Sequence, residues 1–141
     1  MSAPLRHISA IRDRLIGSPD LVALVPANQV YLSYIFGPVE VAYPCIALSQ
    51  VNANRGVWAP YVLDPATVQV DIYTKGDTGL NDAATIGELV DALLHNQQAL
   101  TSNNSACVAQ IRRIWGNTPI WQEDVDAWRM TFRYNVHVFN F

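Results

Sequence analysis

The chain has 141 residues, half of them hydrophobic, and a formal net charge of −3. This length and composition fit one folded domain and exclude a disordered chain. No apolar run approaches the roughly 20 residues that a membrane-spanning helix needs, and an acidic balance gives no general attraction to nucleic acid. The N-terminal residues lack the continuous apolar region of a secretory signal, so we expect synthesis in the cytoplasm and no membrane contact. We expect Cys45 and Cys107 to be free, buried thiols.

Two helices are predicted at the start of the chain. Apolar residues at three- and four-residue spacing predict a first helix that ends at Gly17. A second, short helix is predicted to run to Val25, with Ser18 as its cap. We expect His7 and Arg12 to face solvent. The apolar stripe of the first helix consists of Leu5, Ile8, Ile11 and Leu15.

Two strands and a long loop follow. Val30–Phe36 and Pro44–Val51 are rich in β-branched and aromatic residues and read as strands. The segment 52–66 is predicted to be a long loop, and long loops are often functional or mobile. Its aromatic side chains either fold back over a sheet edge or form an arm that binds a partner.

The clearest pattern in the chain is a change of hydrophobic period between Thr67 and Leu94. Val68, Val70 and Ile72 alternate with polar residues, which predicts a strand buried on one face. From Leu80 onward the apolar spacing becomes helical. We expect Asp77 or Thr78 to cap this helix, and the helix to lie across the buried face of the strand.

The rest of the chain predicts two further strands. His95–Ser105 is polar and is predicted to be a loop, whereas Ala106–Trp115 is strand-like with an ambiguous inward face. Gly116–Pro119 breaks that strand, and Ile120–Asp126 leads into the last one. Ala127–Phe139 alternates strictly and is long for a strand, so it is expected to extend beyond the body of the domain.

These elements predict a single α+β domain that covers residues 1–141. Its sheet is expected to be mainly antiparallel and to have about five strands. One long helix and an N-terminal helix pair are expected to pack on one face of the sheet.

The sequence contains little that indicates catalysis. The three histidines lie on different predicted elements, and no phosphate-binding or nucleophile motif is present. Glu123, Asp124 and Asp126 fit an acidic surface turn better than an acid–base pair. We therefore predict that the protein is not an enzyme and has no catalytic, cofactor-binding or metal-binding residues.

Four arginines near the end of the chain allow two interpretations. Arg112, Arg113, Arg129 and Arg133 either form a basic strip on one sheet face or pair with Asp71 and Glu123 across strands. We favour the pairing, because DNA-reading surfaces carry more basic residues than this.

The remaining signal is a surplus of aromatic side chains. The tryptophans and Tyr61 do not all fit one small core, and tryptophan is enriched at protein interfaces. An assembly protein is therefore the leading class. The candidate interface residues are Arg55, Trp58, Tyr61, Trp115, Trp121, Glu123 and Asp124.

The order of elements resembles the tail terminator, or tail-completion, proteins of long-tailed phages and tail-like particles. The resemblance extends from about Leu5 to Val138. It rests on an N-terminal helix pair followed by YPCIALS, TVQVDIYTK, LNDAATIGELVDALL and RMTFRYNVHV.

The resemblance implies a structural subunit of the virion tail or neck. Such a subunit forms a hexameric ring on the tail tube, stops its polymerisation and binds the head–tail connector, while DNA passes through the lumen without sequence-specific contact. A head–tail stopper or adaptor of the same neck is an alternative. A small ligand-binding domain or enzyme, with its pocket between the sheet and the long helix, is a second.

Overall fold

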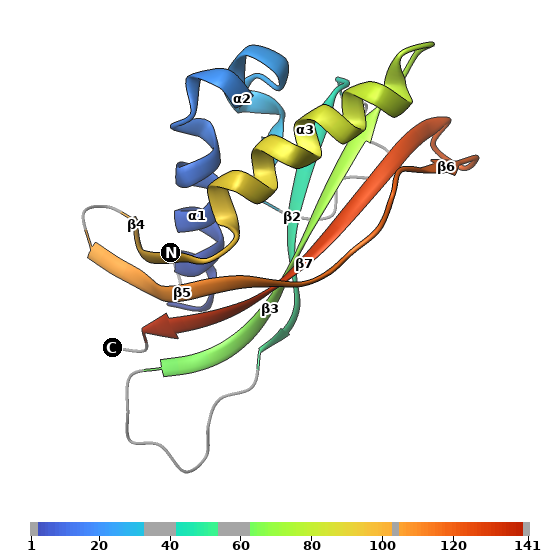
Figure 1. Cartoon of the computed structure of the whole chain (residues 1–141). Coiled ribbons are helices and arrows are strands. Elements are labelled where there is room, and N and C mark those ends of the chain that lie inside the picture. The colour runs from blue at the N-terminus through green and yellow to red at the C-terminus, as the bar shows by residue number, and fades with distance from the viewer. Residues whose placement is uncertain (1–2, 33–41, 54–62, 103–104, 140–141) are drawn as a thin grey trace.

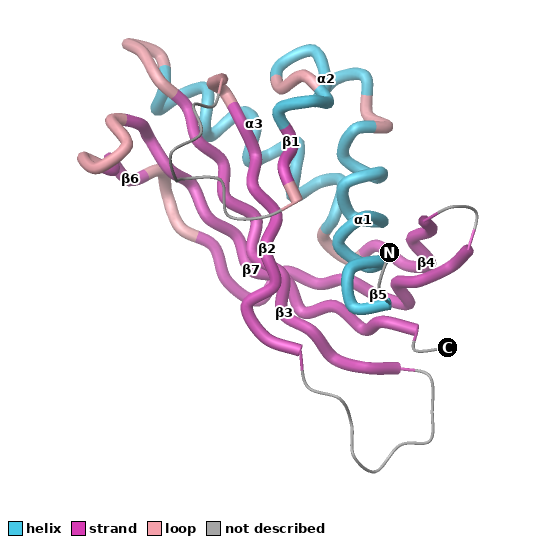
Figure 2. The backbone as a smooth tube through the Cα atoms, turned by 180° about the vertical axis from the view of Figure 1, so that it is seen from behind, coloured by secondary structure: helices cyan, strands magenta, loops and turns pink. Residues whose placement is uncertain are grey.

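A strongly twisted sheet carries the helices on one face, and no described helix lies on its other face (Figures 1 and 2). The computed structural model describes residues 3–32, 42–53, 63–102 and 105–139. The predicted α+β class and largely antiparallel sheet are confirmed: β1 and β2 run parallel, and every other strand pair in the described residues is antiparallel.

The described sheet has seven strands, two more than the sequence suggests, in the order β1-β2-β3-β7-β5-β4, with β6 paired to β7. The last strand is central: it pairs with β3 along one side and with β5 and β6 along the other. The strands are β1 (Val30–Tyr31), β2 (Cys45–Ala53), β3 (Leu63–Thr74), β4 (Gln97–Ser102), β5 (Ser105–Gly116), β6 (Ile120–Gln122) and β7 (Ala127–Phe139).

The helices are α1 (Ala3–Ile16), α2 (Pro19–Leu24) and α3 (Gly79–Leu94), with a short 3-10 turn at Ala27–Gln29. None of the described helices is both long and apolar enough to cross a bilayer.

The core lies between the helices and the alternating apolar residues of β3 and β7. Val68, Val70 and Ile72 are fully buried, as their period-two pattern predicts. Each large aliphatic side chain buried in this way contributes roughly 1.5–3 kcal/mol to stability. The same core cluster as these three β3 residues includes Ile8, Ile11 and Leu15 from α1, Ile86, Val90 and Leu94 from α3, and Phe132, Tyr134 and Val136 from β7.

The two helix caps differ from each other. The Ser18 side chain accepts a hydrogen bond from the backbone N–H of Leu21, as expected for a cap. The predicted side-chain cap of α3 is wrong: Thr78 occupies the cap position without a capping bond, and its hydroxyl donates to Asp82 at 2.9 Å instead. The cause lies in the backbone, because Thr78 has a ψ of 6° rather than the extended conformation that usual caps adopt.

Several predicted boundaries are also wrong. Residues 97–102, predicted as loop, form the edge strand β4, because an edge strand has one neighbour and needs no apolar alternation. Both ends of the predicted 52–66 loop are strand, since β2 continues to Ala53 and β3 begins at Leu63. The strand predicted over 30–36 is described only as Val30–Tyr31. The candidate residues of the 52–66 loop lie outside the described residues.

Two residues of α1 predicted to face solvent lie against the body of the domain. His7 is only 2% exposed. Arg12 donates from Nε to the carbonyl of Val30 and from Nη2 to that of Ala27, both at 2.9 Å. The inward face of α1 is wider than its apolar stripe, because a helix lying over a sheet also buries the residues beside the stripe.

Candidate protein interface

Large apolar side chains are exposed at the end of the sheet formed by β5 and β6. Ile114 and Trp115 of β5 are 55% and 47% exposed, and Ile120 and Trp121 of β6 are 49% and 42% exposed. Single exposed hydrophobic residues are ordinary on protein surfaces, whereas a cluster of them rimmed by charge indicates a site of interaction.

One part of this cluster lies on the sheet face opposite the helices. Trp115 and Ile120 line a hollow of about 170 Å³ together with Arg133. The guanidinium carbon of Arg133 lies 5.6 Å from the centre of the Trp115 ring, and its Nε donates to Oε1 of Gln69 at 3.0 Å. Arg112, which pairs with Asn135 in the sheet, adds a second exposed cation to this face. We call Arg112, Trp115, Ile120 and Arg133 the basic face.

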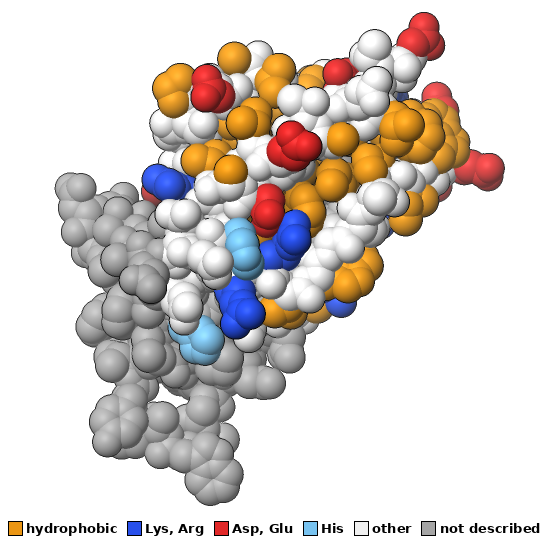
Figure 3. Space-filling view, viewed as in Figure 1, with side chains coloured by type: hydrophobic (Ala, Val, Ile, Leu, Met, Phe, Trp, Pro, Cys, Tyr) orange, Lys and Arg blue, Asp and Glu red, His pale blue; other side chains and the backbone are white. Residues whose placement is uncertain are grey.

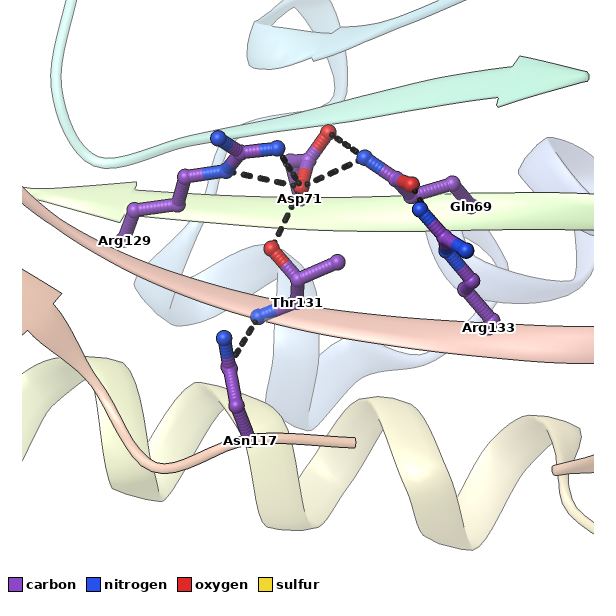
Figure 4. A network of polar contacts seen from close by, with 6 residues as sticks. All are labelled: Gln69, Asp71, Asn117, Arg129, Thr131 and Arg133. Carbon is purple, nitrogen blue, oxygen red and sulfur yellow. Dashed lines mark hydrogen bonds and ion pairs between the residues drawn. The ribbon is translucent and has the colours of Figure 1, made fainter. Parts of the chain in front are cut away.

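A network around a buried carboxylate orients Arg133 of the basic face (Figure 4). Asp71, whose side chain is 3% exposed, forms an ion pair with Arg129 at 3.0 Å and accepts a hydrogen bond from the Thr131 hydroxyl at 2.6 Å. It also accepts from Nε2 of Gln69 at 2.9 Å, which turns the Gln69 oxygen toward Arg133. The backbone N–H of Thr131 donates to Asn117 at 2.8 Å. The predicted pairing of Asp71 with an arginine is therefore confirmed.

Arg113 pairs elsewhere. It forms an ion pair with Asp91 of α3 at 3.0 Å, and its backbone N–H donates to Nδ1 of His95 at 3.1 Å. The Tyr134 hydroxyl donates to the other Asp91 oxygen at 2.9 Å, and burial, together with the nearby Asp91 charge, raises the pKa of Tyr134. The other predicted partner, Glu123, is exposed and has no cationic partner among the described residues, so that part of the predicted pairing is wrong. Arg113 therefore ties β5 to α3 and is not part of the basic face.

The other part of the cluster lies on the helix side of the sheet. Trp121 packs edge-to-face against Trp128, with ring centres 5.4 Å apart. Trp128 in turn lies against the start of α3, where a Cβ added to Gly79 would meet its ring at 2.7 Å. Leu80, the next residue of α3, is 45% exposed.

Acidic side chains surround this apolar surface. The β3–α3 turn, which carries Asp77, and the β6–β7 turn, which carries Glu123 and Asp124, lie side by side at this end of the molecule (Figures 1 and 2). All three carboxylates are exposed. Figure 3 shows acidic side chains around a cluster of hydrophobic ones at this end. We call Asp77, Leu80, Trp121, Glu123 and Asp124 the acidic end.

A family model described as "Tail completion protein gp17" matches residues 9–138. The chain belongs to this family. The match supports a structural role in the completion of a phage tail. A search of curated proteins finds no match.

The fold of this tail completion protein also occurs in a solved structure. A chain in "Virion of native gene transfer agent (GTA) particle" superposes with a TM-score of 0.76 at 16% sequence identity. The similarity covers 99% of this chain and 98% of that one. At this level of identity the similarity shows a shared fold.

The predicted interface residues that the structure describes lie on two different surfaces of the tail completion protein. Ile120 stands opposite Arg129, and Trp121 stands opposite Trp128. Because neighbouring residues of a strand point to opposite faces, Ile120 belongs to the basic face and Trp121 to the acidic end. Trp115 belongs to the basic face because it stands opposite Arg133 in the sheet and its ring lies beside that guanidinium. Sequence reasoning did not single out Ile120 or Leu80 for the interface. The basic strip that the sequence offered as the less favoured interpretation is present in part, because Arg112 and Arg133 lie on one face of the sheet while Arg129 is paired with Asp71.

The helix side of the tail completion protein also contains an open groove of about 580 Å³ between α3 and β5. Its floor is Met130 and Phe132, and Gly87 leaves that floor uncovered: a Cβ there would lie 2.6 Å from the Met130 sulfur. Within the described residues no three histidine, cysteine or acidic side chains gather closely enough to hold a metal ion. Cys45 is free and buried, and burial raises the pKa of its thiol to about 12.

Proposed function

We propose that this tail completion protein forms a hexameric ring on the end of the tail tube, stops further polymerisation of the tube and binds the head–tail connector. In this role it is made in the host cytoplasm and resides in the virion tail or neck. Family membership supports the proposal, as does the shared fold with a chain of a virion particle.

The observation that carries the proposal is the exposed cluster at the β5–β6 end of the sheet. Four large apolar side chains, two of them tryptophans, remain exposed there in the single chain. Tryptophan and arginine are the residue types most enriched where proteins bind each other. Assembly into a larger structure would explain why both the apolar side chains and the charges beside them are exposed in the single chain.

The ring is also proposed to let DNA through without holding it. The chain is acidic overall, and two of the four arginines near its C-terminus are neutralised by Asp71 and Asp91. A passage lined with few unpaired cations does not bind a phosphate backbone tightly, so DNA slides along it.

The decisive experiment examines particles produced without the protein. Tails from cells that lack it are expected to be longer than normal and variable in length, because nothing halts the tube. Electron micrographs of negatively stained particles measure this directly. Tails of normal length that are not joined to heads would instead identify a head–tail stopper or adaptor and overturn the terminator role.

The region beneath Val90 and Leu93 gives no support to a small ligand-binding domain or enzyme. Val90 is fully buried there, and Leu93 packs against the same core. A pocket between the sheet and α3 would require these positions to line an unfilled, polar cavity.

A further inference from the structure

We propose that neighbouring copies of the chain pack head to tail, with the basic face of one copy against the acidic end of the next. This inference rests on the proposed ring and specifies which surfaces meet within it.

The basic face carries charge that the chain itself leaves unbalanced. Arg113 and Arg129 are neutralised by Asp91 and Asp71. Arg112 and Arg133 have no carboxylate partner among the described residues. Arg133 is nevertheless held in one position, because Gln69 accepts its Nε–H and Trp115 lies beside it. A cation held in place beside an exposed aromatic ring and a hollow is arranged to receive an acidic side chain.

The acidic end supplies the opposite charge. Within the described part of the chain, Asp77, Glu123 and Asp124 have no cationic partner. Leu80 and Trp121 of the same end are both more than 40% exposed. The charge of this surface is therefore opposite to that of the basic face, and both surfaces combine apolar side chains with charged ones. Such complementarity selects the correct partner and sets the register of docking.

The position of the two surfaces determines the symmetry of the contact. They lie on opposite faces of the same end of the sheet, because Ile120 and Trp121 of β6 point in opposite directions. A contact between two different surfaces of identical subunits is heterologous, and repeating it generates a closed ring when the rotation closes.

DNA is a weaker match for the basic face. Two unpaired arginines are few for a surface that binds a phosphate backbone. Trp115 and Ile120 would remain exposed to water beside a passing duplex, whereas a second copy of the chain would cover them.

The test uses two charge-reversal variants of the full chain and a matched control. The first variant is Arg112→Glu with Arg133→Glu, and the second is Glu123→Lys with Asp124→Lys. The control, Asp13→Lys with Asp20→Lys, makes the same charge change as the second variant at exposed positions of α1 and α2. Association is measured by sedimentation velocity over a range of concentrations, and by counting labelled protein on the ends of purified tail tubes. Circular dichroism checks that each variant is folded.

We expect each variant alone to associate at least about thirtyfold more weakly than the wild type, since like charges then face each other. The control is expected to associate like the wild type. An equimolar mixture of the two variants should recover association, because each retains the surface that the other lacks and the two reversed surfaces also match.

The outcomes separate the inference from the proposed function. A wild-type protein that does not associate, with or without tubes, removes the ring and the inference together. Wild-type-like rings from either variant leave the ring standing and overturn the charge pairing. If both variants associate weakly and their mixture does not recover association, the charge pairing is also overturned, because the two surfaces then do not contact each other. Normal assembly of the arginine variant with loss of DNA binding would assign the basic face to DNA.

Discussion

Asp71 shows how a single residue supports a surface that it does not itself form. It is buried on the sheet face without helices, and the hydrogen bonds of Gln69 and Thr131 surround its ion pair with Arg129. A buried carboxylate is costly unless it is paired and hydrogen-bonded, and here both conditions hold. The network joins β3 to β7 and, through Gln69, positions Arg133.

Replacing this carboxylate should destabilise the domain. Asp71→Asn preserves the shape of the side chain but leaves Arg129 without its counter-charge, so we expect the free energy of unfolding to fall by about 3 kcal/mol. Urea denaturation measures this change. Asp77→Asn, at an exposed position, is the matched control and should change stability by less than about 0.5 kcal/mol. Equal effects of the two substitutions would show that the network contributes little.

His7 provides a prediction about pH. Burial lowers the pKa of His7, and the nearby Gln50 side chain opposes this shift, although neither ring nitrogen makes a hydrogen bond of good geometry within the described residues. The unfolded chain therefore binds the proton more readily than the folded one. The free energy of unfolding should therefore be unaffected by His7 above the ordinary histidine pKa of 6.5 and should decrease as the pH falls below it.

The measurement is the urea midpoint at several pH values between 8 and 5, on the order of the range in which histidine titrates. His7→Leu is the control, because it removes this group and keeps His95 and His137. The wild type should lose more stability than the variant on acidification. Parallel curves for the two proteins would show that His7 does not cause the loss.

At the scale of the elements, apolar periodicity predicted correctly those helices and strands that bury one face against the core. The strand that contains Val68 to Ile72, the helix from Gly79 to Leu94 and the closing strand β7 follow their hydrophobic patterns closely. Strand β4 was not predicted, because an edge strand can be polar on both faces and then shows no apolar alternation. The cap of α3 depends on the backbone angles of Thr78, which the sequence does not reveal.

The candidate site was partly predictable for a similar reason. Tryptophan surplus and an acidic turn identified Trp115, Trp121, Glu123 and Asp124 as interface candidates, but their division into two surfaces was not visible. β5 contains irregularities between Val108 and Gln110 and between Arg113 and Trp115. A bulge changes which face the following residue occupies, so simple alternation could not assign Trp115 to a face.

The packing of α3 on the sheet can be tested with one substitution and its neighbour. Val90→Asp places an unpaired charge in the core, where Val90 is fully buried, and we expect a loss of about 4 kcal/mol or more, enough to unfold the subunit. Ala92→Asp adds the same group to an exposed position of the same helix and should leave thermal melting nearly unchanged. A Val90→Asp protein that melts like the wild type would mean that the core does not depend on this face of α3.

At the scale of the whole molecule, charge is unevenly distributed. The unpaired arginines of the basic face and the carboxylates of the acidic end are separated by the sheet, although the chain as a whole is acidic. Association through these surfaces combines apolar burial with charge attraction. Salt screens only the second contribution.

This distribution predicts that assembly depends on salt. Raising sodium chloride from about 50 to 500 mM should weaken association of the wild type by about three- to tenfold, because the Debye length becomes shorter than the reach of the charges. Sedimentation velocity at the two concentrations measures the change. The Arg112→Glu, Arg133→Glu variant should show the opposite trend, since salt then screens repulsion. The same weakening in both proteins would indicate that these charges do not face each other.

The central position of β7 has a consequence for the rate of folding. The strand separates β3 from β5, so the two parts of the sheet join only when it pairs on both sides. Its contacts are distant in sequence: the Thr131–Asp71 hydrogen bond alone joins residues 60 positions apart. Loops of this size must close before such contacts form, and proteins rich in distant contacts fold slowly. We expect pairing of this strand to limit the rate of folding, so substitutions in β7 should slow refolding more than they speed unfolding.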